Sequence, residues 1–253
     1  MCCFSQSVQR VANTRIFSRR IDESRQAIAY QMEFAADSDL AMILPLPVVV
    51  GSGEEAVKFI NLKGYDTFFT DLDSAFPNIE AKSLGRSNYA PAAGDPQPQL
   101  VVQSVGSFEA SFVPTVADFR RLDERFRIAP EIWGKIPGYA DYGFAVFKLK
   151  KGDHKVHPMA LSFPSRHPEK LFFPTVHIHD GEVHTKEHFD HELYCQVTRP
   201  GLFEMMKWEE SPGLAKGVCK VEKSEGLLYG DGHIYRRRMV GDFANKDIVL
   251  GAA

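Results

Sequence analysis

The segment 175–184 constrains the fold more than any other part of this sequence, because two turn-forming residues separate two runs of alternating residues. Asp180-Gly181 is among the strongest short signals for a two-residue hairpin turn, in which both central residues need positive φ. The sequence therefore predicts an antiparallel β-hairpin at this point.

The hairpin register would collect the polar residues of this segment on one face. Side chains alternate along a strand, and directly opposed residues of the two strands point to the same side. One face would carry three imidazoles and a carboxylate, from His177, His179, Glu182 and His184. Ile178 and Val183 would form the opposite, apolar face.

This polar face predicts a divalent transition metal, Zn²⁺ or Fe²⁺. Opposed Cβ atoms lie about 5 Å apart, so two imidazoles can reach one ion at roughly 2.1 Å from each nitrogen. Glu182 would be the fourth ligand or the base that acts on bound water. Two alternatives stay open: a solvated polar face that binds nothing, and proton chemistry without a metal.

The other histidines add candidates, since all nine lie beyond Asp153. We favour His157 over His154 as a further ligand, because a strand-like run follows it. His188, His191 and Cys195 would share one face of a helix but not of a strand.

Three resemblances accompany these patterns. The His177-x-His179-x-x-Glu182 spacing resembles the metal-binding strand motif of cupins, where a distant histidine completes the ligand set. Segments 2–5, 13–17, 40–47 and 139–147, with the histidine hairpin, resemble a family of uncharacterised bacterial proteins. That likeness implies a bacterial origin and no particular activity.

The N-terminus supplies the third resemblance. Removal of Met1 would expose Cys2, whose own α-amino group, with a pKa of about 7.7–8, can serve as a base. Met1-Cys2 followed by segment 16–22 resembles the start of choloylglycine hydrolases. The resemblance implies a Cys2 nucleophile, with Arg19 or Arg20 and Asp22 in support.

Composition excludes some partners and settings. A net charge of −3 and a pI near 6.3 argue against nucleic acid as a partner. Arg236-Arg237-Arg238 is interpreted as a solvated edge strand. The longest apolar stretch, 40–50, is interrupted by two prolines, which argues against a membrane span. Four cysteines without a spaced framework favour a reduced, cytoplasmic setting.

The order of patterns predicts a strand-rich α+β fold with mainly antiparallel sheets and a few short helices. Strands are expected at 14–17, 27–34, 40–50, 100–112 and 143–150, the first three as a meander. Helices are expected at 52–60, 65–76 and 116–126. One compact domain would span 1–253, with a possible subdivision at the Pro/Ala-rich loop 86–99.

Three functions of different classes follow. The first is a metal-dependent protein built on the histidine face. The second is a hydrolase that acts through Cys2. The third is a non-enzymatic binding or assembly protein, whose partner is a small molecule or another protein. The sequence leaves the substrate and the oligomeric state open.

Overall fold

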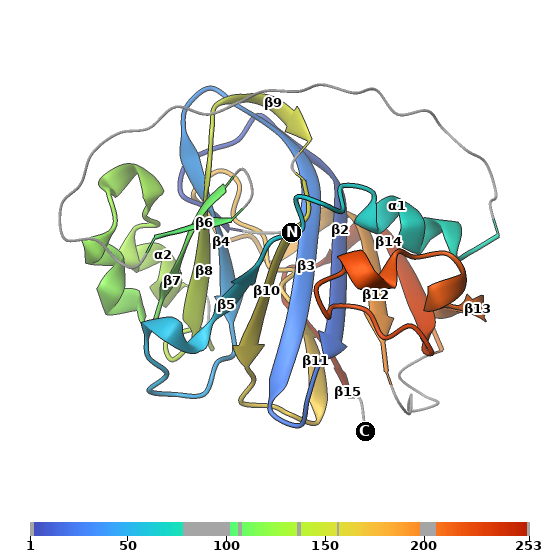
Figure 1. Cartoon of the computed structure of the whole chain (residues 1–253). Helices are drawn as coiled ribbons and strands as arrows, with labels where there is room; N and C mark the ends of the chain where they lie inside the picture. The colour runs from blue at the N-terminus through green and yellow to red at the C-terminus, as the bar shows by residue number, and fades with distance from the viewer. Residues whose placement is uncertain are drawn as a thin grey trace.

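The computed structural model describes residues 3–77, 102–105, 108–135, 138–155, 157–197 and 206–251. The described chain is rich in β-strands with a few short helices, as predicted (Figure 1). The boundary predicted at 86–99 lies outside these residues, and the single domain stays a prediction. None of the described helices is long and apolar enough to cross a membrane.

The first group of elements lies within residues 3–77. Its members are β1 (Cys3–Phe4), β2 (Arg10–Arg20), β3 (Arg25–Ala36), β4 (Leu40–Leu46), η1 (Glu54–Ala56), β5 (Lys58–Ile60) and α1 (Phe68–Ser74). Next come β6 (Gln103–Val105), β7 (Phe108–Val113), η2 (Val116–Arg121), η3 (Glu124–Phe126), α2 (Pro130–Gly134) and β8 (Gly143–Leu149).

The remaining elements form most of the large sheet. They are β9 (Gly152–Lys155), β10 (Met159–Pro164), β11 (Lys170–Phe173), β12 (Lys186–Gln196), β13 (Glu209–Leu214), η4 (Ala215–Gly217), η5 (Val221–Lys223), β14 (His233–Ala244) and β15 (Ile248–Gly251).

Two sheets and a two-stranded ribbon organise these strands. The larger sheet has the order β13-β14-β12-β2-β3-β10-β5, and β9 also pairs with β3. The smaller sheet has the order β1-β4-β8-β7-β6, while β11 pairs with β15. Among the described strands, each pairing is antiparallel except that of β12 with β2. The predicted preference for antiparallel pairing is confirmed.

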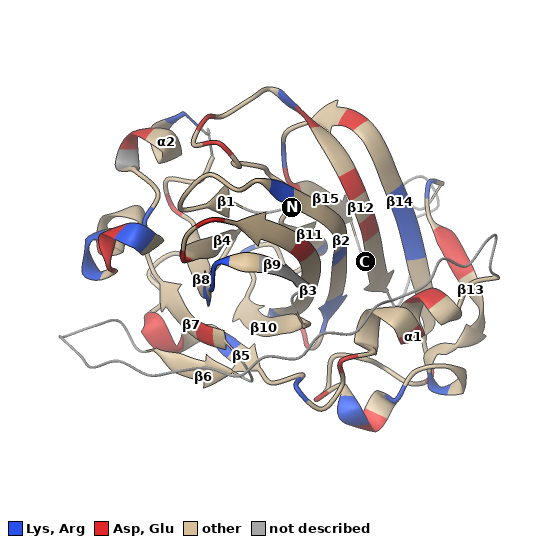
Figure 2. Ribbon diagram, turned by 90° about the horizontal axis from the view of Figure 1, so that it is seen from above, with Lys and Arg blue, Asp and Glu red and all other residues tan. Residues whose placement is uncertain are grey.

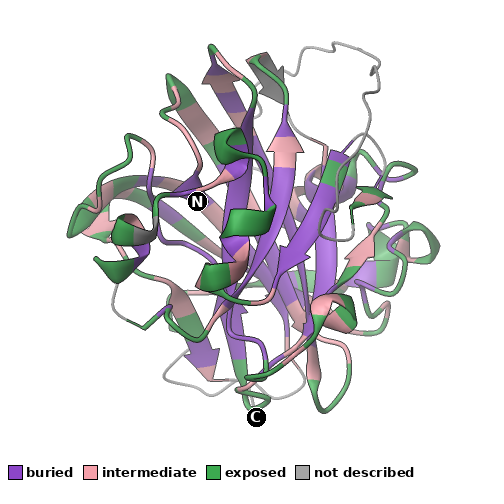
Figure 3. Cartoon of the chain, turned by 90° about the vertical axis from the view of Figure 1, so that its left-hand side faces the viewer, coloured by how far each residue is buried: buried purple, intermediate pink, exposed green. Residues whose placement is uncertain are grey.

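The main core lies between the two sheets, and each sheet has a second buried face. In β4, Met42 and Leu44 enter the main core, whereas Ala41 and Ile43 face a separate cluster beneath η2, η3 and α2. A strand covered on both faces needs a continuous apolar run, which explains the sequence of β4. Figure 3, seen from the α2 side, shows buried strands behind short, exposed helices.

A third apolar cluster lies under α1, on the outer face of the large sheet. Phe68, Phe69 and Leu72 of α1 pack there against Phe17 of β2 and Tyr194 of β12. Figure 1 places α1 on one side of the strands and α2 on the other.

Three local expectations were wrong. Residues 58–60 form strand β5 rather than the end of a helix, because they pair with β10 at the edge of the large sheet. The opening strands are not one meander, since β4 leaves β3 and pairs with β8 and β1. Residues 236–238 lie within β14, which is flanked by β12 and β13 and is not an edge strand.

Candidate functional site

Segment 174–185, which carries most of the predicted site, does not form the predicted hairpin. Gly181 has a φ of 82°, but Asp180 is absent from the positive-φ residues, and a type I′ turn needs positive φ at both positions. Asp180 instead accepts a hydrogen bond from the amide of Glu182 through its Oδ1, at 2.9 Å. Ile178 forms a parallel bridge with Cys3 rather than pairing with Val183.

The side chain of Asn245 holds the two ends of this segment together. Asn245 lies in the turn between β14 and β15. Its Oδ1 accepts from the His177 amide at 2.7 Å, and its Nδ2 donates to the carbonyls of His177 and His184, both at 2.9 Å. One amide side chain thus takes the place of the backbone pairing expected from a hairpin.

Asp247, two residues further along, anchors the start of the segment. Its Oδ1 accepts from the amides of Thr175 at 2.8 Å and Val176 at 3.0 Å, and Oδ2 accepts from the hydroxyl of Tyr139. Burial raises the pKa of the Asp247 carboxyl to about 6, although these hydrogen bonds favour its charged form. Sequence reasoning missed Asn245 and Asp247, because nothing in their local sequence relates them to a segment so distant in the chain.

The segment still alternates, as an extended chain does. Val176 and Ile178 enter the apolar cluster beneath α2, and His177 and His179 turn the opposite way. The ring centroids of His177 and His179 lie 5.1 Å apart. The prediction that these two imidazoles share a face is confirmed.

The face they share is buried against β12. The His177 ring lies 4.4 Å from that of Phe189 and 5.1 Å from that of His191, both on β12. His177 and His191 are fully buried. Burial lowers the pKa of both well below its usual value, and lowers the pKa of His179 to about 4, so all three imidazoles are neutral near pH 7. Strand pairing confirms the strand alternative for His188 and His191, which point to opposite faces of β12.

His184 and Glu182 lie apart from this histidine cluster, which consists of His177, His179 and His191. His184 is exposed, and its Nε2 lies 2.9 Å from Oδ2 of Asp180. That contact raises the pKa of His184 and lowers that of Asp180. Glu182 is also exposed and forms an ion pair with Lys135 at 3.2 Å. The predicted set of three histidines and one glutamate is therefore divided between the interior and the surface.

The remaining predicted residues contribute elsewhere. The His157 ring packs on that of Phe108 with centroids 4.2 Å apart, and burial lowers its pKa. Among the described residues, no three His, Cys, Asp or Glu side chains come close enough to hold a metal ion. Cys2 lies outside the described residues, so its proposed role stays a prediction.

Arg19 and Asp22, two of the three residues expected to support Cys2, have other partners in the structure, and Arg20 lines the hollow described below. Arg19 donates to the carbonyls of Leu227 at 2.7 Å and Gly226 at 2.6 Å. Asp22 accepts from the amides of Ser24 and Arg25 and so closes the turn between β2 and β3. Arg19 therefore stabilises the backbone at residues 226–227, and Asp22 stabilises the turn between β2 and β3.

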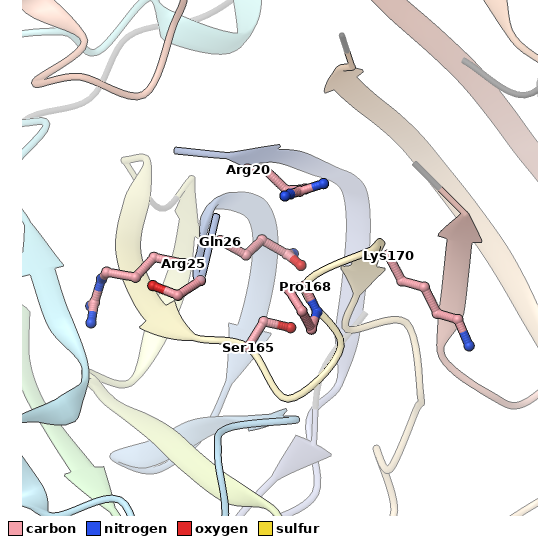
Figure 4. Close-up of a pocket in the computed structure, with 7 residues that line it drawn as sticks. Arg20, Arg25, Gln26, Ser165, Pro168 and Lys170 are labelled. Carbon is pink, nitrogen blue, oxygen red and sulfur yellow. The ribbon is translucent and has the colours of Figure 1, made fainter. Parts of the chain in front are cut away.

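A shallow surface hollow lies beside that same turn. Arg20, Arg25 and Lys170 line it (Figure 4). The charged ends of Arg25 and Lys170 point away from each other, and Arg25 Nη2 donates to the carbonyls of Ala56 and Ser162. The hollow therefore does not bring its cations together on one ligand position.

Comparison with known proteins relates the fold to a viral protein. Neither a family model nor a curated protein matches the sequence. The crystal structure of baculovirus P35 is similar with a TM-score of 0.51 and 12% identity, covering 99% of each chain. A mutated baculovirus P35 after caspase cleavage is similar with a TM-score of 0.51 and 13% identity, over 96% of this chain and 100% of that one.

These findings correct the three resemblances suggested by the sequence. The P35 fold is unrelated to cupins and to choloylglycine hydrolases, and no match supports the bacterial family. The shared motifs were short, and a His-x-His alternation arises in any extended segment with two histidines two residues apart. Across nearly its whole length, this chain has the fold of baculovirus P35.

Proposed function

We propose that this chain is a protein-binding protein whose partner is a protease of the caspase class. The observation that carries the proposal is a fold shared with baculovirus P35 over 99% of both chains. A mutated form of that protein has been crystallised after cleavage by a caspase. Among the three functions derived from the sequence, this corresponds to the binding protein.

The histidine cluster has a structural role in this proposal. Phe4 and Val8 donate their amides to the carbonyls of Ile178 and His179, at 3.0 and 3.1 Å. Segment 174–185 thereby connects the N-terminal segment to the turn between β14 and β15, and its histidine rings pack on β12. The contact surface of the binding protein is then sought among exposed residues, not among the buried imidazoles.

The test mixes the full chain at micromolar concentration with a panel of active caspases. We expect one or more members to lose peptide hydrolysis in proportion to added protein and to leave a complex or a single cut, located by intact mass. A trypsin-like serine protease and a papain-like cysteine protease serve as controls. Undiminished activity throughout the panel, with no complex and no discrete cut, would refute the proposal.

Divalent metal binding is a second candidate, and the gathering of neutral imidazoles favours it. A metal ion requires neutral histidine, and burial keeps His177, His179 and His191 in that form. The Nε2 atoms of His177 and His191 lie 3.3 Å apart, so the side chains would have to rearrange to add a third ligand.

Thermal unfolding with Zn²⁺ or Fe²⁺ after chelator treatment tests this candidate. An ion at 100 times its dissociation constant stabilises the folded state by about 2.7 kcal/mol. His177→Ala should remove that gain and His184→Ala should keep it. An unchanged unfolding midpoint of the unaltered protein with either ion would eliminate the metal-binding candidate.

The hydrolase that acts through Cys2 requires removal of Met1, and the intact mass of the purified protein shows whether Met1 is removed.

A further inference from the structure

Arg237 occupies an apolar position on β14. Tyr235 and Met239, two residues away on either side, point to the same face and are buried in the main core. On β12, Arg237 pairs with Leu193, which belongs to the same core. Arg237 is the charged residue in this row, at the margin where the core meets solvent.

The neighbouring arginines show how differently Arg237 is placed. Arg236 and Arg238 project from the opposite face of β14 and bind carboxylates there, Arg236 with Asp73 at 2.7 Å and Arg238 with Glu192 at 3.1 Å. Figure 2 shows this basic band of β14 beside the acidic bands of β12. The side chain of Arg237 makes no hydrogen bond or ion pair within the described part of the chain, although its backbone pairs with β12.

The strand register places Trp208 opposite Arg237. Glu209, the first residue of β13, pairs with Arg236 of β14 in antiparallel strands, so extending this register by one residue sets Trp208, which directly precedes β13, opposite Arg237. The Trp208 ring packs on Phe173 of β11 with centroids 5.6 Å apart, which puts it on the core-facing side, the same side as Arg237. The covered indole N–H of Trp208 also lacks an acceptor among the described residues.

A half-buried guanidinium without a counter-charge is unfavourable. Removing a charge from water costs free energy that an ion pair or hydrogen bonds normally offset. Burial lowers the pKa of Arg237, and no neighbouring carboxylate of the described chain raises it. A long side chain can lay its methylene groups on an apolar surface and keep its charged end in water. Such an arrangement explains why Arg237 packs against the core, and it leaves the guanidinium able to bind an anion.

We propose that Arg237 and Trp208 form a binding site for a single carboxylate carried by a peptide with an adjacent apolar side chain. The planar guanidinium matches a carboxylate in two parallel hydrogen bonds. One guanidinium balances one negative charge, which favours a carboxylate over a phosphate. The Trp208 ring would contact the apolar part of the ligand. This site rests on its own observations and not on the protease proposal.

The two tryptophans make the test specific, because their indole N–H groups give two resonances in an ¹⁵N-labelled protein. Trp133 packs with Phe119 and Phe144 beneath α2 and serves as the internal control. The probes are acetate, acetyl-phenylalanyl-glutamate amide and its glutamine isostere. We expect the glutamate peptide to shift the Trp208 resonance saturably at millimolar concentration, with the glutamine peptide inactive and Trp133 unmoved.

Variants identify the guanidinium. Arg237→Gln should lower the affinity for the glutamate peptide roughly tenfold or more. Substitution of the exposed Arg120, as Arg120→Gln, should leave that affinity unchanged. Saturation by acetate at the same concentration assigns the site to small free carboxylates, and saturation by the peptide alone assigns it to a partner chain. Equal responses to the glutamate and glutamine peptides, a response retained by Arg237→Gln, or no saturable shift would overturn the proposal. The comparison of the two peptides needs no variant.

Discussion

The Nε2 atoms of His177 and His191 face each other at 3.3 Å in the interior of the protein. A hydrogen bond between two such nitrogens needs one proton, donated by one ring and accepted by the other. Protonating the pair fully would place two N–H groups against each other in an apolar environment. The interior packing of this region therefore depends on neutral imidazoles.

Acid should destabilise the fold through these histidines. The pKa of His179 is about 4 in the folded chain, and those of His177 and His191 are also lowered, against about 6.5 when unfolded. Between those values the unfolded state binds more protons, so the free energy of unfolding rises with pH and falls as pH drops below about 6.5.

Asp247 acts in the opposite direction over part of that range. Its folded pKa of about 6 exceeds the unfolded value of about 3.9, so it favours the folded state at lower pH. The destabilisation by acid from the three histidines should exceed the opposite contribution of the Asp247 carboxyl. Urea unfolding should give a lower free energy of unfolding at pH 5 than at pH 7. We expect this difference to be smaller in His191→Phe. A wild-type stability independent of pH over this interval would contradict the neutral cluster.

Asn245→Ala should release the segment 174–185. The change removes three hydrogen bonds and leaves backbone groups of His177 and His184 without partners, at a cost of about 2–3 kcal/mol. Amide hydrogen exchange in 175–185 should accelerate. Asn61→Ala is a matched control, because Asn61 is exposed and accepts one local bond from Lys63, at 2.9 Å. Equal effects of the two changes would show that Asn245 does not fix the segment.

Elements with strong local patterns were predictable from the sequence. The expected helix at 65–76 contains α1, and apolar runs gave β2, β3, β4 and β8 near their observed positions. The alternation of apolar residues decides which face of a strand is buried, so the local sequence is enough to predict these elements. The helix expected at 116–126 became two short 3-10 turns, η2 and η3.

The candidate site was predictable only in part. Alternation correctly placed His177 and His179 together, since an extended chain needs no partner to alternate. The partners that bury them, Phe189 and His191, depend on which strand lies alongside. The bonds from Asn245 that replace the hairpin depend on a turn distant in sequence. Long-range side-chain contacts of this kind have no local signature.

Gly143→Ala should destabilise the small sheet by overpacking. A Cβ at Gly143 would lie 2.5 Å from two ring atoms of Phe112 and 3.0 Å from Val48. A buried methyl group in a packed core costs about 1–3 kcal/mol when the neighbours must shift. Gly213→Ala is the control, because a Cβ there would have no described neighbour within 4 Å. Thermal unfolding should separate the two variants, and equal midpoints would show that Phe112 yields freely.

Arg236 and Arg238 offer the sharpest comparison of ion pairs, because they lie two residues apart on one strand and both approach Asp73, at 2.7 and 3.7 Å. The Arg236 side chain is 6% exposed, binds Glu209 as well and lies 4.1 Å over the Phe76 ring. The Arg238 side chain is 53% exposed, where water screens the charge.

Arg236→Met should therefore cost about 1–3 kcal/mol and loosen α1 on the large sheet, whereas Arg238→Met should cost less than about 1 kcal/mol. Urea unfolding gives the two free energies, and hydrogen exchange in 68–76 reports on α1. Arg236→Met would also test the contribution of charge alone, since methionine retains much of the apolar stem over Phe76. An Arg236→Met variant as stable as Arg238→Met would mean that apolar packing, rather than the buried ion pairs with Asp73 and Glu209, fixes α1 to the sheet.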